Sequence, residues 1–227
     1  MSRVLPILFN TDMVRAILEG RKTVTRRKIP IDFVNYCDID TDGTLLSYEN
    51  DCGDFIEPKK LCQYQPGDIL YVRETWEHFD CCSCEGDEHG NCPKEPQKSV
   101  LDKYGCGCYM YRATDEISGD AKWHPSIHMP KKAARIWLKV KDVRVERLQD
   151  MPHDGPLKEG IQYDECPTGF TWKQETDMHN CYTTPMGAMQ ALWDSTINKS
   201  DVDRYGWDAN PLVWVIEFER CEKPERV

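Results

Sequence analysis

The most informative stretch of this chain reads Ile17-Leu18-Glu19-Gly20-Arg21-Lys22-Thr23-Val24-Thr25-Arg26-Arg27. Upstream of it, apolar side chains recur at helical spacing after Thr11, at Met13, Val14, Ile17 and Leu18. This pattern predicts a helix capped by Thr11. Gly20 supplies the left-handed residue that ends such a helix, and the β-branched residues 23–25 predict a strand. A corner between a helix and a strand holds the backbone at both ends, so it presents its side chains in defined positions.

This corner brings three kinds of reactive or charged group together. Lys22 carries an amine, Thr25 carries a hydroxyl, and guanidinium groups come from Arg21, Arg26 and Arg27. Such a set is sufficient for a nucleophile, a base and an anion-binding group. The corner is therefore the first candidate site.

Charge is distributed unevenly along the 227 residues, which carry a net charge of −10. A strongly acidic chain is a poor general binder of nucleic acid. Residues 1–28 and 129–149 each hold seven basic and two acidic side chains, whereas residues 29–58 hold eight acids and no Lys or Arg. The acidic segment is typical of a solvated loop. The two basic segments form either one anion-binding face or two ordinary solvated faces.

The composition points to a cytoplasmic protein without a membrane partner. With 40% apolar residues the chain can bury one sizeable core. No stretch approaches the roughly 20 apolar residues of a membrane span, and the first residues are too short and interrupted for a secretory signal. Its 12 cysteines are therefore expected to be metal ligands or buried thiols and not a disulfide framework.

The remaining patterns predict an α+β fold in one domain over residues 1–227. A turn at 65–68 leads into a strand over 69–76, and apolar alternation over 134–148 breaks at Lys141-Asp142, which indicates a bulge or a tight bend. Thr184-Pro185 opens a helix through about Asn198, and a last strand covers 212–218. We expect a small β-barrel flanked by helices, with insertions at about 32–63, 79–121 and 163–183.

The chain resembles the ASCH domains, which are relatives of the PUA RNA-binding fold. The motif that carries the resemblance is Gly20-Arg21-Lys22-Thr23-Val24-Thr25-Arg26-Arg27. It is supported by the Pro66-Gly67-Asp68 turn, the strands over 134–148 and 213–218, and Lys158-Glu159-Gly160-Ile161 at the end of the segment 150–161. The segments 71–76, 125–130 and 210–214 resemble the larger ASCH proteins of phages and prophages. Together these segments cover about half of the chain.

The resemblance implies a PUA/ASCH-like barrel and two functions. The first is recognition of RNA, or of a modified nucleotide or nucleoside, in a basic pocket. The alternative is an amidohydrolase that removes an acyl group from a modified nucleoside such as N4-acetylcytidine; other ASCH proteins are reported as ribonucleases. A third possibility, a phage protein that binds a host protein, has no specific residue behind it. Whether the chain is an enzyme, and its oligomeric state, stay open.

By motif position the catalytic residues of such a hydrolase are Lys22, Thr25 and Glu159. Thr25 would attack the acyl carbonyl, Lys22 would accept the hydroxyl proton, and Glu159 would hold the leaving amine or a water. Lys22 and Thr25 would point to opposite faces of a regular strand, so Lys22 must belong to the preceding turn. The structural alternatives are a surface lysine, a half-buried strand threonine and a surface glutamate.

The predicted substrate-binding residues are Arg21, Arg26, Arg27, Arg73, Glu74 and Trp76. An arginine binds a phosphate or a base edge, and a tryptophan stacks on a base. The alternatives are an ion pair between Arg73 and Glu74, and core packing of Trp76.

A cysteine-rich segment provides the second chemical signal. Six cysteines fall within 28 residues: Cys81, Cys82, Cys84, Cys92, Cys106 and Cys108. Their surroundings are too polar to bury a core, and a tetrahedral zinc held by four of these thiolates would supply the missing folding energy. We therefore expect a structural zinc. Reduced thiols and a redox role are the alternatives.

Overall fold

The computed structural model describes residues 2–30, 37–39, 45–49, 55–80, 107–116, 122–164, 169–171, 173 and 181–224. Its strands are β1 (Val4–Leu8), β2 (Val24–Lys28), β3 (Cys37–Ile39), β4 (Leu45–Glu49), β5 (Phe55–Ile56), β6 (Ile69–Arg73), β7 (Trp76–Asp80), β8 (Gly107–Tyr111), β9 (Trp137–Arg147), β10 (Gln162–Asp164), β11 (Gly169–Thr171) and β12 (Leu212–Cys221). Its α-helices are α1 (Thr11–Leu18), α3 (Pro58–Leu61), α4 (Gly155–Lys158), α5 (Pro185–Ser195) and α6 (Val202–Tyr205), joined in places by short 3₁₀ turns.

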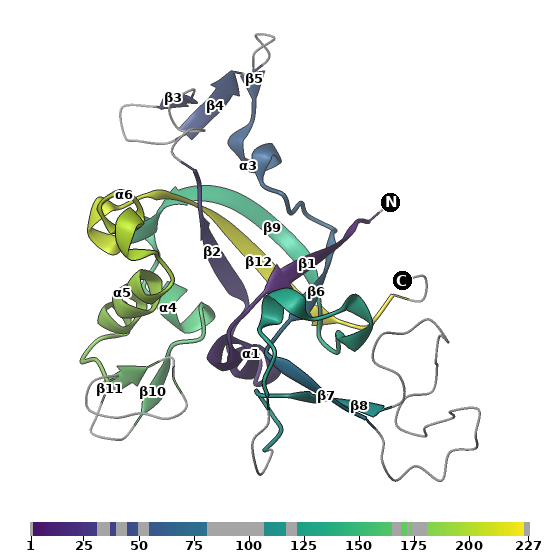
Figure 1. Cartoon of the computed structure of the whole chain (residues 1–227). Coiled ribbons are helices and arrows are strands. Elements are labelled where there is room, and N and C mark those ends of the chain that lie inside the picture. The colour runs from purple at the N-terminus through teal and green to yellow at the C-terminus, as the bar shows by residue number, and fades with distance from the viewer. Residues whose placement is uncertain are drawn as a thin grey trace.

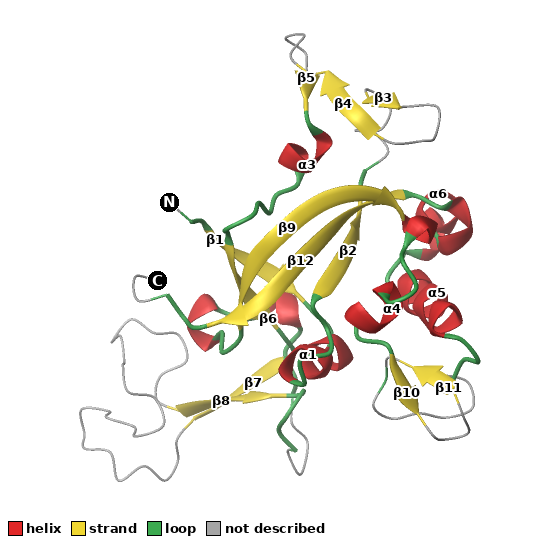
Figure 2. Ribbon diagram, turned by 180° about the vertical axis from the view of Figure 1, so that it is seen from behind, coloured by secondary structure: helices red, strands yellow, loops and turns green. Residues whose placement is uncertain are grey.

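A five-stranded sheet forms the centre of the molecule, and few helices accompany it. The strand order is β1-β6-β9-β12-β2, with β1 parallel to β6 and the other neighbours antiparallel. The long strands β9 and β12 curve strongly, and α4, α5 and α6 lie on the side where β2 ends the sheet (Figures 1 and 2). The expected mixed α and β class is confirmed.

The predicted closed barrel is wrong at the level of backbone pairing. Among the described residues, β1 and β2 are the two outer strands, and no ladder joins them. Side chains bridge this seam instead: Arg27 on β2 donates from Nη2 to the carbonyl of Leu8 on β1 at 2.9 Å. Tyr64, from the loop before β6, donates its hydroxyl to the carbonyl of Pro6 on β1 at 2.8 Å. The sheet is curved but open.

Side chains alternate between the two faces of β12, and each face packs into a separate hydrophobic core. Ile216 and Phe218 pack with Val14 and Ile17 of α1 in one core, while Val213 and Val215 pack with the buried face of α5 in the other. That face consists of Ala188, Met189, Leu192 and Trp193. Strand β12 therefore presents one face to each core.

The elements around the first candidate site agree well with the sequence. Helix α1 ends as expected at Gly20, which has φ 76°. Its cap is Asn10 and not Thr11, because the Asn10 side chain accepts a hydrogen bond from the backbone of Met13 at 2.9 Å. Strand β2 begins at Val24, so Lys22 lies in the turn, as the hydrolase hypothesis requires.

Other elements match in kind and differ in their bounds. The strand expected over 69–76 is split into β6 and β7, because Glu74 turns into the interior and its N–H lies against the sulfur of Met129. The region 134–148 contains one long strand, β9, and not a pair; the expected bulge is confirmed, since Lys141 is skipped between the pairs Glu217–Asp142 and Phe218–Val140. Helix α5 starts as predicted after a Thr184 cap.

The predicted insertions carry small sheets separate from the central one. Strands β3, β4 and β5 form one, β7 with β8 another, and β10 with β11 a third. The rest of these insertions lies largely outside the described residues. None of the described helices combines the length and apolar character that a membrane span requires.

Candidate functional site

The turn between α1 and β2 is anchored at both ends by backbone hydrogen bonds. The N–H groups of Arg21 and Lys22 both donate to the carbonyl of Ala16, at 2.9 and 3.0 Å. The N–H of Thr23 donates to the carbonyl of Lys158 in α4 at 2.9 Å. The corner is therefore attached to α4 as well as to the helix that precedes it.

Lys22 points into the protein and not to solvent. Its side chain is 0% exposed, and its ammonium donates to the carbonyls of Val24 at 2.8 Å and Glu159 at 3.0 Å. A third bond goes to the carboxylate of Glu159 at 2.6 Å. The alternative of a surface lysine is wrong. Three acceptors match the three N–H donors of a protonated lysine.

Glu159 is buried as well, with 3% of the residue exposed, so the alternative of a surface acid is wrong. One carboxylate oxygen accepts from Lys22, and the other accepts from Nη1 of Arg26 at 3.1 Å. The carboxylate therefore bridges two buried cations. Gly160 permits this placement because it has φ 102° and lies against the Lys22 side chain, where a Cβ atom would come within 2.9 Å of the Ala16 Cβ.

The charges continue outward from Arg26 along one face of the sheet. Arg26, whose side chain is 1% exposed, donates from Nε and Nη2 to Glu146 on β9 at 3.0 and 2.6 Å. Glu146 then pairs with Arg144 at 3.3 Å, and Arg144 pairs with Glu217 at 2.5 Å. We call these six residues, from Lys22 to Glu217, the ion chain. The ion chain contains cations of both basic segments, which lie on the two sides of β12, and each of these cations is paired with an acid.

Burial lowers the pKa of Lys22, and the adjacent carboxylate of Glu159 opposes this effect. Arg26 and Arg27 add to the lowering, because nearby positive charges disfavour a further one. Lys22 thus loses its proton more readily than an exposed lysine, which is the property that a general base needs.

Thr25 is buried with 3% exposure and lies opposite Ile216 on β12. Alternation along β2 places its side chain on the same face as that of Arg27, away from that of Arg26. Within the described part of the chain, Thr25 makes no hydrogen bond to Lys22 or Glu159. Of the three predicted catalytic residues, the structure therefore brings Lys22 and Glu159 into direct contact, whereas Thr25 follows Val24 on β2 and is not hydrogen-bonded to either of them.

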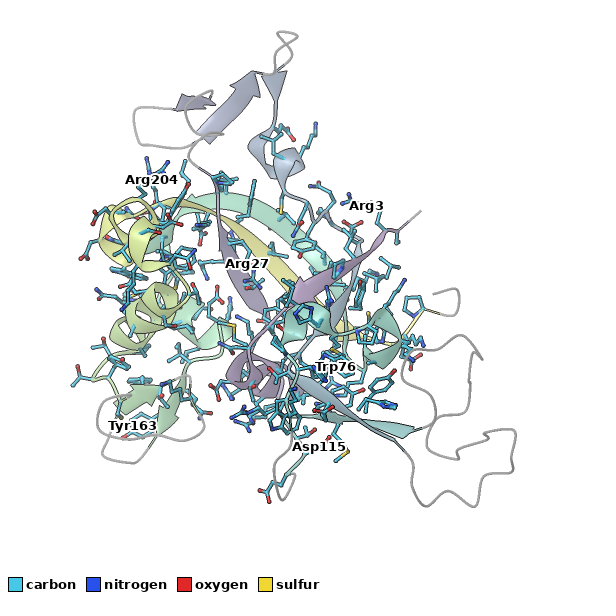
Figure 3. All side chains as sticks on the ribbon, in the orientation of Figure 1. Arg3, Arg27, Trp76, Asp115, Tyr163 and Arg204 are labelled. Carbon is cyan, nitrogen blue, oxygen red and sulfur yellow. The ribbon has the colours of Figure 1, made fainter. Side chains whose placement is uncertain are left out.

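Arg27 lies across the open seam of the sheet and is labelled in Figure 3. Its guanidinium lies 5.4 Å from the ring centre of Phe9, and Nζ of Lys22 lies 5.7 Å from the same ring. Burial lowers the pKa of Arg27. One of its N–H groups is used by Leu8, and an arginine has five. The others are suited to bind an anion.

A cavity of about 550 Å³ opens beside β2. Its walls come from β2, from the segment before β6, from the end of α5 and from β12. The residues that line it are Arg26, Arg27, Lys28, Pro30, Leu61, Cys62, Gln63, Tyr64, Trp193, Thr196, Ile197, Trp214 and Ile216. It combines cationic groups with three aromatic side chains, a combination typical of a binding site for a flat, anionic molecule.

The other predicted binding residues lie away from this cavity. Arg21 binds Glu19 and the carbonyl of Gly160. Arg73 donates to the carbonyls of Met129 and Ile127. We give neither a part in the proposed site.

Glu74 and Trp76 take part in the packing around β6 and β7. Arg135, and not Arg73, holds Glu74 through two hydrogen bonds of 2.9 Å. Burial raises the pKa of Glu74, and Arg135 opposes that rise. Trp76 is 0% exposed in a core with Met129 and Trp137, which agrees with the alternative of core packing.

Sequence reasoning missed the aromatic walls of the cavity. Nothing in the sequence pattern around Tyr64, Trp193 or Trp214 sets them apart from ordinary core residues. Glu146 and Arg144 were missed as well, although their place in the second basic segment was a usable signal.

The cysteine-rich segment lies almost wholly beyond what the structure describes. Cys81, Cys82, Cys84, Cys92 and Cys106 are outside the described residues, and Cys108 is described only as a backbone position of β8 opposite Phe79. Among the residues with described side chains, no three His, Cys, Asp or Glu residues form a metal-binding group. The zinc expectation stays a prediction.

Comparison with family models, with curated proteins and with solved structures gave no match to this chain. The ASCH resemblance therefore rests on the sequence motifs alone.

Replacing Glu159 by Gln should destabilise the protein more than replacing Lys22 by Met. Loss of the carboxylate leaves two buried cations without their shared partner, at a cost of about 3–5 kcal/mol in the free energy of unfolding. Loss of the amine leaves Glu159 paired with Arg26. Urea unfolding of both variants measures the difference, and an equal or reversed order would contradict the bridging role.

Gly160→Ala should lower stability by about 1–3 kcal/mol, since it adds a clash with Ala16 to the strain of a positive φ. Gly20→Ala is the matched control: it has φ 76° but nothing within 4 Å of an added Cβ atom, so it reports backbone strain alone. Thermal unfolding of the two variants should show the larger loss for Gly160→Ala. Equal losses would mean that the close approach to Ala16 is unimportant.

Proposed function

We propose that this chain is an ASCH-type protein that binds a single modified nucleotide or nucleoside in the cavity beside β2. The observation that carries the proposal is the cavity itself, where Arg27 and Lys28 meet Tyr64, Trp193 and Trp214. Arginine and lysine bind phosphate, and aromatic side chains stack on bases.

The size of the cavity and the charge of the chain favour one nucleotide over a long strand of RNA. Small-molecule pockets occupy about 300–1,000 Å³, a range that includes this cavity of about 550 Å³. Long RNA requires many unpaired cations along a surface. Here the net charge is −10, and most of the cations of the two basic segments are paired with acids, in the ion chain or elsewhere.

Two of the aromatic walls are held in fixed orientations. The indole N–H of Trp193 donates to the carbonyl of Tyr205 at 2.7 Å, and the hydroxyl of Tyr64 donates to Pro6 at 2.8 Å. A ring that is already oriented loses little conformational freedom when a base stacks on it. Stacking on such a ring contributes about 1–3 kcal/mol per base.

Nucleotide binding should depend on Arg27. We expect at least one of the four ribonucleoside monophosphates, or N4-acetylcytidine 5′-monophosphate, to quench tryptophan fluorescence, because Trp193 and Trp214 line the cavity. Arg27→Gln should weaken that binding about tenfold or more, since a charge-assisted hydrogen bond contributes about 1.5–3 kcal/mol.

The matched control is Arg220→Gln, which removes an exposed arginine on β12 outside the cavity. It should bind as the wild type does. If no nucleotide binds the wild type, or if both variants bind equally, the proposal fails.

The second candidate is an amidohydrolase that removes an acyl group from a modified nucleoside. It is favoured by the direct contact of Lys22 with Glu159 at 2.6 Å, two of the three residues that the ASCH resemblance names. In this scheme the Thr25 hydroxyl attacks the acyl carbonyl and passes its proton to the neutral amine of Lys22. The C–N bond then breaks as the leaving amine of the nucleoside takes that proton, and water hydrolyses the acyl-threonine ester. Burial helps Lys22 to reach that neutral state. In the resting protein, however, the three hydrogen bonds of the Lys22 ammonium stabilise its protonated form, which cannot accept a proton. This favours the binding function over hydrolysis.

Hydrolysis of N4-acetylcytidine, followed by mass spectrometry, separates the two functions. An amidohydrolase should release cytidine with the wild type and with Thr25→Ser, which keeps the hydroxyl. Thr25→Val keeps the shape of the buried side chain but removes the nucleophile, so turnover should fall to background. Turnover by Thr25→Val at the wild-type rate would eliminate the threonine mechanism.

A structural zinc in the cysteine-rich segment remains part of the proposal. It is supported by the spacing of the six cysteines and by the chemistry of four thiolates around zinc. Such a closed site has no open position for substrate, so its role would be folding and not catalysis.

A further inference from the structure

One edge of β2 has no strand partner in the described part of the chain. β2 is the outermost strand of the central sheet and pairs with β12 alone. An antiparallel strand directs the N–H and C=O groups of alternate residues to opposite edges. Half of the backbone groups of β2 therefore point away from β12.

The hydrogen bonds at both ends of β2 show which residues these are. Ile29 donates to the carbonyl of Leu212, and the carbonyl of Thr23 accepts from Phe218, so the odd-numbered positions 23–29 face β12. The carbonyl of Val24 faces the other way and accepts from the ammonium of Lys22 at 2.8 Å. The backbone groups of Arg26 and Lys28 consequently point to the free edge.

The cavity lies at this edge. Its walls include Trp193 and Ile197 from the face of β2 that carries Lys28, and Trp214 and Ile216 from the opposite face. Since both faces contribute, the edge between them borders the cavity. The Arg26 side chain is held by Glu146 and Glu159, which leaves its backbone as the part that faces a ligand.

We propose that the free edge of β2 recognises the Watson–Crick edge of a nucleobase, through the backbone groups of Arg26 and Lys28. This inference rests on the proposed function and adds to it how the base is recognised. The base lies in the cavity in the plane of the strand edge, flanked by the aromatic walls, and its phosphate reaches the guanidinium of Arg27. On the strand, a backbone N–H donor lies beside a backbone C=O acceptor. On the base, a ring acceptor lies beside a donor, so the two edges can form a pair of hydrogen bonds.

A nucleobase suits this edge better than an extended peptide does. Peptides that add a strand to a sheet pair along several residues. Here Lys22 already occupies the carbonyl of Val24, and β2 ends at Lys28, so only two residues offer their backbone groups. The cavity is also lined by aromatic rings and cations, which fit a flat base with a phosphate.

The test compares Lys28→Pro with Lys28→Ala. Both remove the amine, which pairs with Asp201 at 3.3 Å, but only proline removes the backbone N–H at the free edge. Proline is tolerated at edge positions where the N–H faces away from the ladder. With whichever of AMP, CMP, GMP or UMP binds the wild type most tightly, Lys28→Pro should bind about tenfold more weakly than Lys28→Ala.

A second measurement needs only the wild type. The same nucleotide, methylated on the ring nitrogen of its Watson–Crick edge, should bind about tenfold more weakly or worse. The methyl group occupies the position where that nitrogen would form a hydrogen bond with the backbone of β2. Equal affinities of the two Lys28 variants, or full binding of the methylated nucleotide, would overturn the edge inference and leave the cavity as the binding site. Absence of binding by all four nucleotides and by N4-acetylcytidine 5′-monophosphate would instead overturn the proposed function.

Discussion

The carboxylate of Glu159 lies between the ammonium of Lys22 and the guanidinium of Arg26, and much of the structure around it depends on this contact. All three groups are almost wholly removed from water, so each would be costly to bury alone. Together they attach the end of α4 to the turn after α1 and to the outer strand β2, which are adjacent to each other but far from α4 in sequence. Gly160 makes the arrangement possible, since only a residue without Cβ fits its positive φ beside Ala16 and Lys22.

This arrangement also determines what β2 can offer to a ligand. On one face, Arg26 is used up by Glu146 and Glu159, and the ion chain neutralises the charges along β9 and β12. On the other face, Arg27 spans the seam to β1 with donors to spare. The strand edge between the faces borders the cavity. In the proposed function one anionic, base-containing molecule binds there, because Arg27, Lys28 and three aromatic rings line the same cavity.

The sequence predicted the corner well because its signals are local. A glycine stop, a β-branched run and the odd spacing of Lys22 and Thr25 fix where the helix ends and the strand begins, and the structure agrees. Glu159 was reached only through the motif, since 137 residues separate it from Lys22 and no periodicity links them. The open seam was not predictable: no strand was expected over Val4–Leu8, and local patterns do not show which strands pair. The same limit applies to the cavity, whose walls come from four distant segments, and to Glu74, whose partner proved to be Arg135.

The most direct test of this account is amide hydrogen exchange along β2, resolved by residue with NMR, in the free protein and with the bound mononucleotide. The free protein should protect the amides of Thr25 and Arg27, which face β12, and leave those of Arg26 and Lys28 in fast exchange. The nucleotide should slow exchange at Arg26 and Lys28 while Thr25 and Arg27 stay as they were. Slow exchange at all four positions before the nucleotide is added, or no change at Arg26 and Lys28 after it, would contradict a free strand edge that binds the ligand.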